Sequence, residues 1–204
     1  AVIPDPSQFA YSLAEIVINP QNRTLQYAKE EFYDASGKVL YSHVDGRLKE
    51  ITSQEFDEDF YDVIVDAVFA VGEVKRAKAD DRWITLWEST TPDGDRTHAT
   101  ADTTTMRMKG ENLIFWKWTE TKDDTGRVTE IKFQKAAENL PQGTERIIRG
   151  TYWTPAGGWK NLEDDADGAY RMIPAKSVEY KGITKLRAYA KGYSMWLNRY
   201  SIED

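Results

Sequence analysis

The residues with the clearest metal-binding spacing form an acidic run late in the chain. Positions 1, 3, 5 and 6 of a calcium-loop pattern are matched by Glu163, Asp165, Asp167 and Gly168. Position 12 requires a bidentate glutamate, and the chain has Pro174 there. We therefore expect this run to be a solvated turn.

Other groups that could perform catalysis are few. The absence of cysteine excludes a disulfide framework, a thiolate zinc site and a cysteine nucleophile. His43 and His98 are far apart in the sequence and have no local ligand partner, so we expect no metal site and no cofactor. No serine stands in a G-x-S-x-G elbow, and no glycine-rich phosphate loop is present. Carboxylates are numerous, so a general acid–base pair of the hydrolase type stays open as an alternative to a non-catalytic protein.

Aromatic residues are the most conspicuous class, with 7 Trp, 11 Tyr and 7 Phe. Trp116 and Trp118 flank Lys117, so on a strand both rings point to one face while Phe115 and Lys117 point to the other. Two interpretations stay open: packing in the core, or an exposed strip for a sugar, a peptide or an apolar ligand. The candidate binding residues are Trp116, Trp118, Trp153 and Tyr189.

The net charge of -7 is unevenly distributed. Residues 1–80 carry 15 acidic and 8 basic side chains, whereas residues 81–204 carry 19 of each. An acidic segment repels phosphate groups, so neither nucleic acid nor an anionic membrane surface is an expected partner.

The chain has no apolar run of transmembrane length. It begins at Ala1 without an initiator methionine, which fits either a mature end left by signal-peptide removal or a trimmed chain. We adopt the first interpretation, which predicts a secreted, periplasmic or cell-surface protein.

The first part of the chain predicts a β-meander followed by a helix. Runs rich in Tyr, Ile and Val over 9–43 are separated by Asn19–Asn22 and by a tight turn ending at Gly37. Thr52 and Glu55 have capping-box spacing at the start of a predicted helix over 52–71. The side chains expected to form its buried face are Phe56, Phe60, Val63, Ala67 and Val71.

From residue 83 onward, the pattern predicts an antiparallel sheet system with one wet face. Turn sequences such as Asp93-Gly94 and Asp167-Gly168 separate the apolar runs. The predicted strands are 82–88, 97–104, 113–119, 127–134, 145–152, 177–180, 183–191 and 195–200.

Two sets of matching motifs indicate an internal repeat. A Trp, an Asp-Gly turn and a Lys-Gly pair recur in order, first from Trp83 to Gly110 and again from Trp159 to Gly182. Pro20-Gln21 and Gly37 recur as Pro141-Gln142 and Gly158, at a constant offset of 121.

These residues resemble bacterial surface-adhesin E domains. Tyr11-Ser12-Leu13, the run ending in Glu31-Phe32-Tyr33-Asp34 and the helix over 52–71 are similar to the second half of such a domain. The first half is matched by Trp83, Asp93-Gly94, Asp102 and Trp116, and again by Trp159, Asp167-Gly168, Ser177 and Tyr189. The resemblance implies a small sheet-plus-helix domain in the bacterial envelope. The cysteine pair that is common in that family is absent here.

We therefore predict an α+β fold, mostly antiparallel sheet with one packing helix, pseudo-repeated into two similar lobes. The predicted modules are 1–80, 81–158 and 159–204, with the last one pairing with the first so that both termini lie in one lobe. The predicted function is non-catalytic binding through protein–protein contacts, with β edges available to a partner strand. A small-molecule carrier with an aromatic-lined pocket is the alternative.

Overall fold

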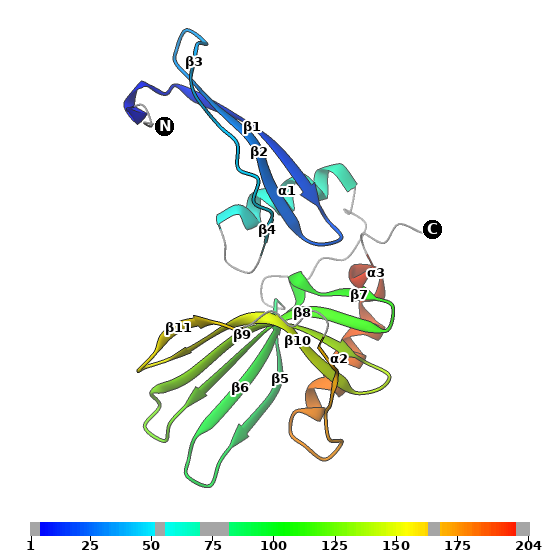
Figure 1. Ribbon diagram of the computed structural model, residues 1–204. Helices are drawn as coiled ribbons and strands as arrows, with labels where there is room; N and C mark the ends of the chain where they lie inside the picture. Colours follow the sequence, from blue (N-terminus) through cyan, green and yellow to red (C-terminus); the bar gives the residue numbers. More distant parts are fainter. Residues whose placement is uncertain (1–4, 52–55, 70–81, 163–167, 199–204) are drawn as a thin grey trace. The chain divides into compact units, whose positions relative to one another are not determined.

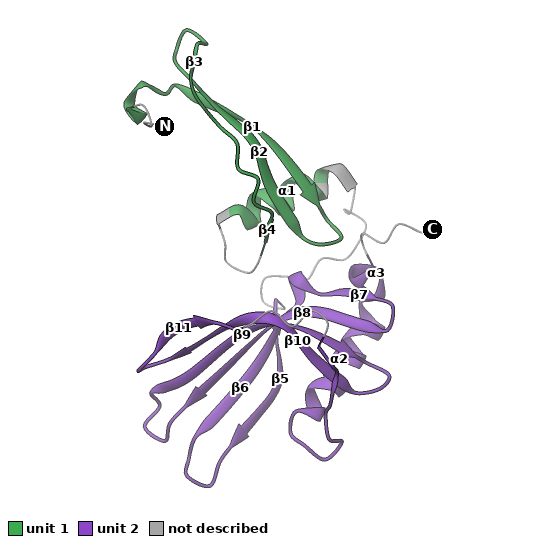
Figure 2. Ribbon diagram, in the orientation of Figure 1, with its two compact units in different colours: residues 1–71, 200–204 green, residues 72–199 purple. Residues whose placement is uncertain are grey.

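The computed structural model describes residues 5–51, 56–69, 82–162 and 168–198. The chain divides into two compact units, residues 1–71 with 200–204 and residues 72–199 (Figure 2). We call them unit 1 and unit 2 and describe each by itself. The capping residues Thr52 and Glu55, the acidic run 163–167 and the last six residues lie outside the described ranges.

Unit 1 is a four-stranded antiparallel sheet with one long helix (Figure 1). The strand order is β1-β2-β3. The short strand β4 pairs with the start of β2, on the same edge that pairs with β3 further along. Its elements are η1 (Pro6–Gln8), β1 (Tyr11–Asn19), β2 (Thr24–Tyr33), β3 (Val39–His43), β4 (Lys49–Glu50) and α1 (Phe56–Phe69).

Helix α1 lies within the predicted range 52–71, but it turns a different face inward than expected. The expected face included Phe60 and Val63, and the side chain of Val63 is 68% exposed. Among the α1 side chains that the structure describes, the buried ones are instead Glu58, Tyr61 and Val65. The helix has two apolar stripes, and the one that also carries carboxylates is turned inward because a buried cation lies on that side.

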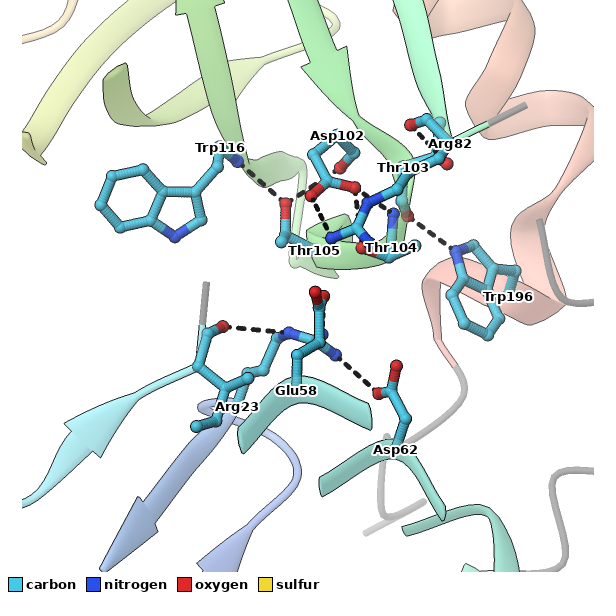
Figure 3. Close-up of polar contacts among 11 residues, drawn as sticks. Arg23, Glu58, Asp62, Arg82, Asp102, Thr103, Thr104, Thr105, Trp116 and Trp196 are labelled. Carbon is cyan, nitrogen blue, oxygen red and sulfur yellow. Dashed lines mark hydrogen bonds and ion pairs between the residues drawn. The ribbon is translucent and has the colours of Figure 1, made fainter. Parts of the chain in front are cut away.

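That cation is Arg23, whose guanidinium donates to Glu58 at 2.8 Å and to Asp62 at 3.2 Å (Figure 3). Its Nε also donates to the carbonyl of Ile51 at 3.1 Å. Arg23 thus links the first hairpin, the start of the loop after β4 and α1. The apolar core of unit 1 consists of Leu25, Ile51, Tyr61 and Val65, and the Arg23 guanidinium lies over the ring of Tyr61.

Unit 2 is built on an eight-stranded antiparallel sheet with the path β11-β10-β9-β8-β6-β5. The short strand β12 pairs with β10, and β7 pairs with β8. Helices α2 and α3 cover one face, where Leu86, Phe115 and Leu186 are in the core (Figure 1). Its elements are β5 (Trp83–Thr90), β6 (Arg96–Asp102), η4 (Thr103–Thr105), β7 (Arg107–Lys109), β8 (Asn112–Lys122), β9 (Val128–Asn139), β10 (Thr144–Thr154), β11 (Gly158–Asn161), β12 (Arg171–Met172), α2 (Tyr180–Gly192) and α3 (Ser194–Leu197).

Buried Asp102 organises the turn that follows β6 (Figure 3). Its carboxylate accepts from the backbone and the hydroxyl of Thr104, at 3.0 and 2.7 Å, and from Arg82 at 3.1 Å. The indole of Trp196 donates to the carbonyl of Thr103 at 3.0 Å, which fastens α3 to this turn. Asp102, one of the residues behind the adhesin-like resemblance, therefore has a structural role, because it caps a 3-10 turn.

The prediction of a mostly antiparallel sheet protein is confirmed, but the prediction of a single helix is wrong. Residues 183–191 were expected to form a strand and lie in α2, and residues 195–197 lie in α3. The apolar side chains that face the sheet recur at helical spacing, at Ile183, Leu186 and Ala190. This spacing favours a helix more strongly than the β-branched residues at the start of the segment favour a strand. The second copy of the Trp-led strand module is consequently not formed at 177–191.

The described part of the last predicted module belongs to unit 2, where β11 pairs with β10 and α2 packs on β5. The last module was also predicted to pair with the first. The part of it after residue 198 lies outside the described ranges.

Candidate functional site

Two hairpins, β1–β2 in unit 1 and β9–β10 in unit 2, share their register at a constant offset of 120 residues. Asn19 pairs with Thr24 in the first hairpin, and Asn139 pairs with Thr144 in the second. In both turns the asparagine Oδ1 accepts a backbone N–H three residues on, at 3.1 and 3.0 Å. The two turns correspond at an offset of 120, and not at the offset of 121 that the Pro-Gln pairs predicted.

The last residue of each turn has a left-handed backbone. It is Arg23, with a φ of 53°, in the first hairpin and Gly143, with a φ of 69°, in the second. The carbonyl of Arg23 accepts a hydrogen bond from the backbone N–H of Ile51 at 2.8 Å, which joins the end of β4 to the first hairpin. In the same way, the carbonyl of Gly143 accepts from the N–H of Ile173 at 3.0 Å, which joins the end of β12 to the second hairpin. Glycine adopts this conformation without strain, whereas Arg23 is held there by its ion pairs.

The match extends to a β-bulge and to the start of each helix. The pairing shifts at Ile16–Tyr27 in the first hairpin and at Ala136–Ile147 in the second, again 120 residues apart. A basic residue in the short strand then pairs with an acidic residue eight positions later. The two pairs are Lys49 with Asp57, at 2.9 Å, and Arg171 with Glu179, at 3.2 Å.

The first difference between the hairpins lies at their outer edge. In unit 2, β9 pairs with β8 from Asn112–Asn139 to Lys122–Val128. Among the described residues, no strand pairs with the corresponding edge of β1. Tyr11, Leu13 and Val17 are exposed along β1, with Leu13 at 59%. An edge strand with exposed apolar side chains can accept a further strand.

The second difference lies inside. Ile18 and Leu25 face each other across β1 and β2 in the apolar core of unit 1. The corresponding pair in unit 2 is Glu138 and Glu145, and both are buried. Two carboxyl groups thus occupy a place that the same backbone elsewhere fills with apolar side chains.

These carboxyl groups line a small pocket between the sheet and the start of α2. Lys117 of β8 forms an ion pair with Glu145, which also accepts from Arg171 at 3.0 Å. Glu138 is only 3% exposed, and its Oε2 has no hydrogen-bond partner among the described residues. The pocket is lined by Leu86, Trp87, Lys117, Glu138, Glu145, Arg171, Ile173, Glu179 and Gly182.

The two carboxyl groups have opposite protonation tendencies. Burial raises the pKa of Glu138 to about 8, against partial compensation by Lys117. Burial acts in the same direction on Glu145, but Lys117 and Arg171 outweigh it and hold the pKa of Glu145 below its ordinary value. Near neutral pH the Glu138–Glu145 pair therefore consists of one carboxylic acid and one carboxylate.

Three of the four predicted binding residues lie on the sheet face opposite this pocket. Trp116 and Trp118 both contact Phe133, with ring centroids 4.5 and 5.9 Å apart, and Trp153 pairs with the exposed Trp159 across β10 and β11. As expected, Phe115 and Lys117 point the other way, to the core and the pocket. Tyr189 does not join this face, because it lies in α2 and stacks on Tyr193.

The aromatic face is partly packed and partly exposed. Trp116 is buried beneath Phe133 and the guanidinium of Arg149, whereas Trp159 is 54% exposed. The small-molecule carrier hypothesis predicted a pocket lined by aromatic side chains. Among the described residues, the carboxyl pocket has Trp87 in its lining, and none of the four predicted binding residues. A binding role for the aromatic face stays a prediction.

The two histidines lie in different units. His98 contacts the Thr85 hydroxyl at 3.1 Å, and His43 stacks on Tyr41. Within the described ranges no three His, Cys, Asp or Glu side chains are grouped as metal ligands. The described helices include none with the length and apolar character needed to span a membrane.

Comparison of the chain with protein-family models, with curated proteins and with solved structures finds no match.

Proposed function

We propose that this protein is a non-catalytic binding module that accepts an extended strand of a partner protein along the open edge of β1. The observation that carries the proposal is the difference between the two matched hairpins at this edge. β9 has β8 beside it, whereas β1 has no such neighbour among the described residues. Strand addition supplies main-chain hydrogen bonds for affinity and alternate side-chain contacts for specificity.

The pairing of β8 with β9 serves as a guide to the partner strand. That strand would run antiparallel to β1 and alternate apolar side chains, as Leu113 and Phe115 do on β8. Residues 1–71 carry 13 acidic and 5 basic side chains, so a partner with a net positive charge is favoured. A second copy of unit 1 would bring like charges together and is disfavoured.

Two broader proposals accompany this one. Unit 1 would correspond to the β9–β12 and α2 half of unit 2, as two related lobes, and the matched register supports that correspondence. The second is a location in the bacterial envelope, which the adhesin-like resemblance supports. Fractionation of the expressing cells would test this location.

A peptide with the sequence of β8, residues 112–122, tests the edge directly. Its affinity for the full chain is measured by fluorescence anisotropy against wild type and two lysine variants. Leu13→Lys places a charge on β1, and we expect it to weaken binding at least tenfold. Val44→Lys makes the same kind of change at an exposed site outside β1 and should leave the affinity unchanged.

Failure of the peptide to bind at millimolar concentration would contradict the proposal. Equal weakening by both lysine variants would also contradict it, because binding would then reflect general charge rather than the β1 edge.

A further inference from the structure

The pocket around Glu138 has no role in strand binding at β1 and is not required by the hairpin. The first hairpin closes the same position with Ile18 and Leu25. A buried carboxyl oxygen without a hydrogen-bond partner is destabilising compared with an apolar side chain of similar size. A group retained at such a cost is a candidate for binding a ligand.

The charges around the pocket decide which ligand would fit. Lys117 and Arg171 carry two positive charges, and Glu145 and Glu179 carry two negative charges. The cluster is neutral when Glu138 is protonated and has a charge of -1 when Glu138 is ionised. An ionised Glu138 therefore calls for one additional positive charge.

We propose that the pocket binds a small monovalent cation, an ammonium or primary alkylammonium group, which donates to Glu138 Oε2 in exchange for the carboxyl proton. The protonated acid and the incoming cation give a carboxylate–ammonium pair, and one proton leaves to solvent. No bond to carbon is made or broken.

Size and lining agree with this class of ligand. The cavity volume is about 30 Å³, which is enough for a group of the size of one or two water molecules. Leu86 and Ile173 offer apolar contact to a carbon substituent, and the ring of Trp87 suits a cation. The partly exposed side chains of Arg171 and Glu179 mark a route to the surface. A divalent metal is a poorer fit, because no group of three carboxylate or histidine ligands is found in the described ranges.

Proton exchange makes the binding dependent on pH. Because burial raises the pKa of Glu138 to about 8, a proton competes with the cation at neutral pH. The affinity should fall about tenfold for each pH unit below that value and level off above it.

Calorimetric titration of the full chain with methylammonium chloride tests the proposal. Titrations at pH 7 in two amine-free buffers of different ionisation enthalpy give the number of protons released, and we expect about one per bound cation. The affinity should be at least tenfold higher at pH 8 than at pH 6. Glu138→Gln, which keeps the shape of the side chain, should lose at least tenfold in affinity, whereas Glu88→Gln on the exposed face should not.

The wild-type protein alone suffices to overturn the proposal. Absence of saturable binding at pH 9, or binding without proton release at pH 7, would contradict it whatever the variants do. Tetramethylammonium, which has no N–H group, should not bind, and equal binding of this ion would also contradict the proposed contact. Failure here would leave strand binding at β1 unaffected, since that proposal rests on unit 1.

Discussion

Glu138 lies directly opposite Glu145 across β9 and β10, at the positions that Ile18 and Leu25 occupy in the matching hairpin of unit 1. One backbone arrangement thus carries an apolar pair in one unit and a carboxyl pair in the other. The apolar pair shows what folding requires at this place. The carboxyl pair, together with Lys117 and Arg171, is an addition that folding does not explain.

Replacing Glu138 by the residue of the matching position should stabilise unit 2. Glu138→Ile removes a buried, unpartnered carboxyl and adds apolar contact, and we expect a gain of about 1–3 kcal/mol at pH 7. The reverse change in unit 1, Ile18→Glu, should cost roughly 3 kcal/mol or more. For Glu138→Ile the measurement is urea unfolding followed by tryptophan fluorescence, which reports on unit 2 because all seven Trp lie there. For Ile18→Glu it is hydrogen exchange of β2 amides, which reports on unit 1. A loss of stability in Glu138→Ile would show that the carboxyl is structural.

The pH dependence of stability should carry the signature of Glu138. The pKa of Glu138 is about 8 in the folded protein and has its ordinary value of 4.5 in the unfolded chain. Between these values the unfolded chain has released a proton that the folded chain keeps, so rising pH favours unfolding. The contribution of Glu138 to the free energy of unfolding is fully present below pH 4.5 and is lost by about pH 8. Between these values the free energy of unfolding falls by at most about 1.4 kcal/mol per pH unit.

The measurement is the difference in unfolding free energy between wild type and Glu138→Gln from pH 5 to pH 9, in amine-free buffer. The wild type should lose stability relative to the variant up to about pH 8. Parallel curves would mean that Glu138 is already ionised in the folded protein.

Arg23 should be the most sensitive polar residue of unit 1. Arg23→Ala removes the cation beside buried Glu58, and loss of one partner of a buried ion pair costs about 3–5 kcal/mol. Arg47→Ala removes an exposed pair with Asp45 and should change stability by less than about 0.5 kcal/mol. Hydrogen exchange of β2 amides measures unit 1 separately. Similar effects of the two variants would contradict the central position of Arg23.

The aromatic face should respond unevenly to a soluble quencher. Trp159 is the most exposed Trp of the described face, so Trp159→Phe should remove the largest part of acrylamide quenching. Trp116→Phe should change quenching little, because Trp116 is covered by Phe133 and Arg149. Strong quenching at Trp116 would revive an exposed aromatic strip for ligand binding.

Sequence patterns predicted the long strands β5, β6, β8, β9 and β10 of unit 2 and the position of α1, because their alternation, turns and helical spacing are local. The short strands β7 and β12 were not predicted, because two or three residues are too few to show a period. The patterns failed for α2, where a short segment satisfied both the strand and the helix period. They also failed for the inward face of α1, because Arg23 comes from a distant turn and makes Glu58 and Asp62 inward-facing.

The carboxyl pocket was missed, although a signal for it is present in the sequence. Aligning Asn19 and Thr24 with Asn139 and Thr144 at offset 120 places Glu138 on Ile18 and Glu145 on Leu25. The Pro-Gln pairs suggested offset 121, which shifts every strand residue to the opposite face. Lys117 and Arg171 could not be assigned to the pocket without knowing that β8 and β12 flank this hairpin.

Residue-resolved hydrogen exchange over β1, residues 11–19, tests strand acceptance at this edge most directly. In the full chain alone, we expect slow exchange at amides that bond to β2 and fast exchange at the alternate amides that face the open edge. Adding the 112–122 peptide should slow the fast set at least tenfold and leave the other set unchanged. Uniformly slow exchange without peptide, or fast exchange that the peptide does not alter, would contradict strand acceptance at β1.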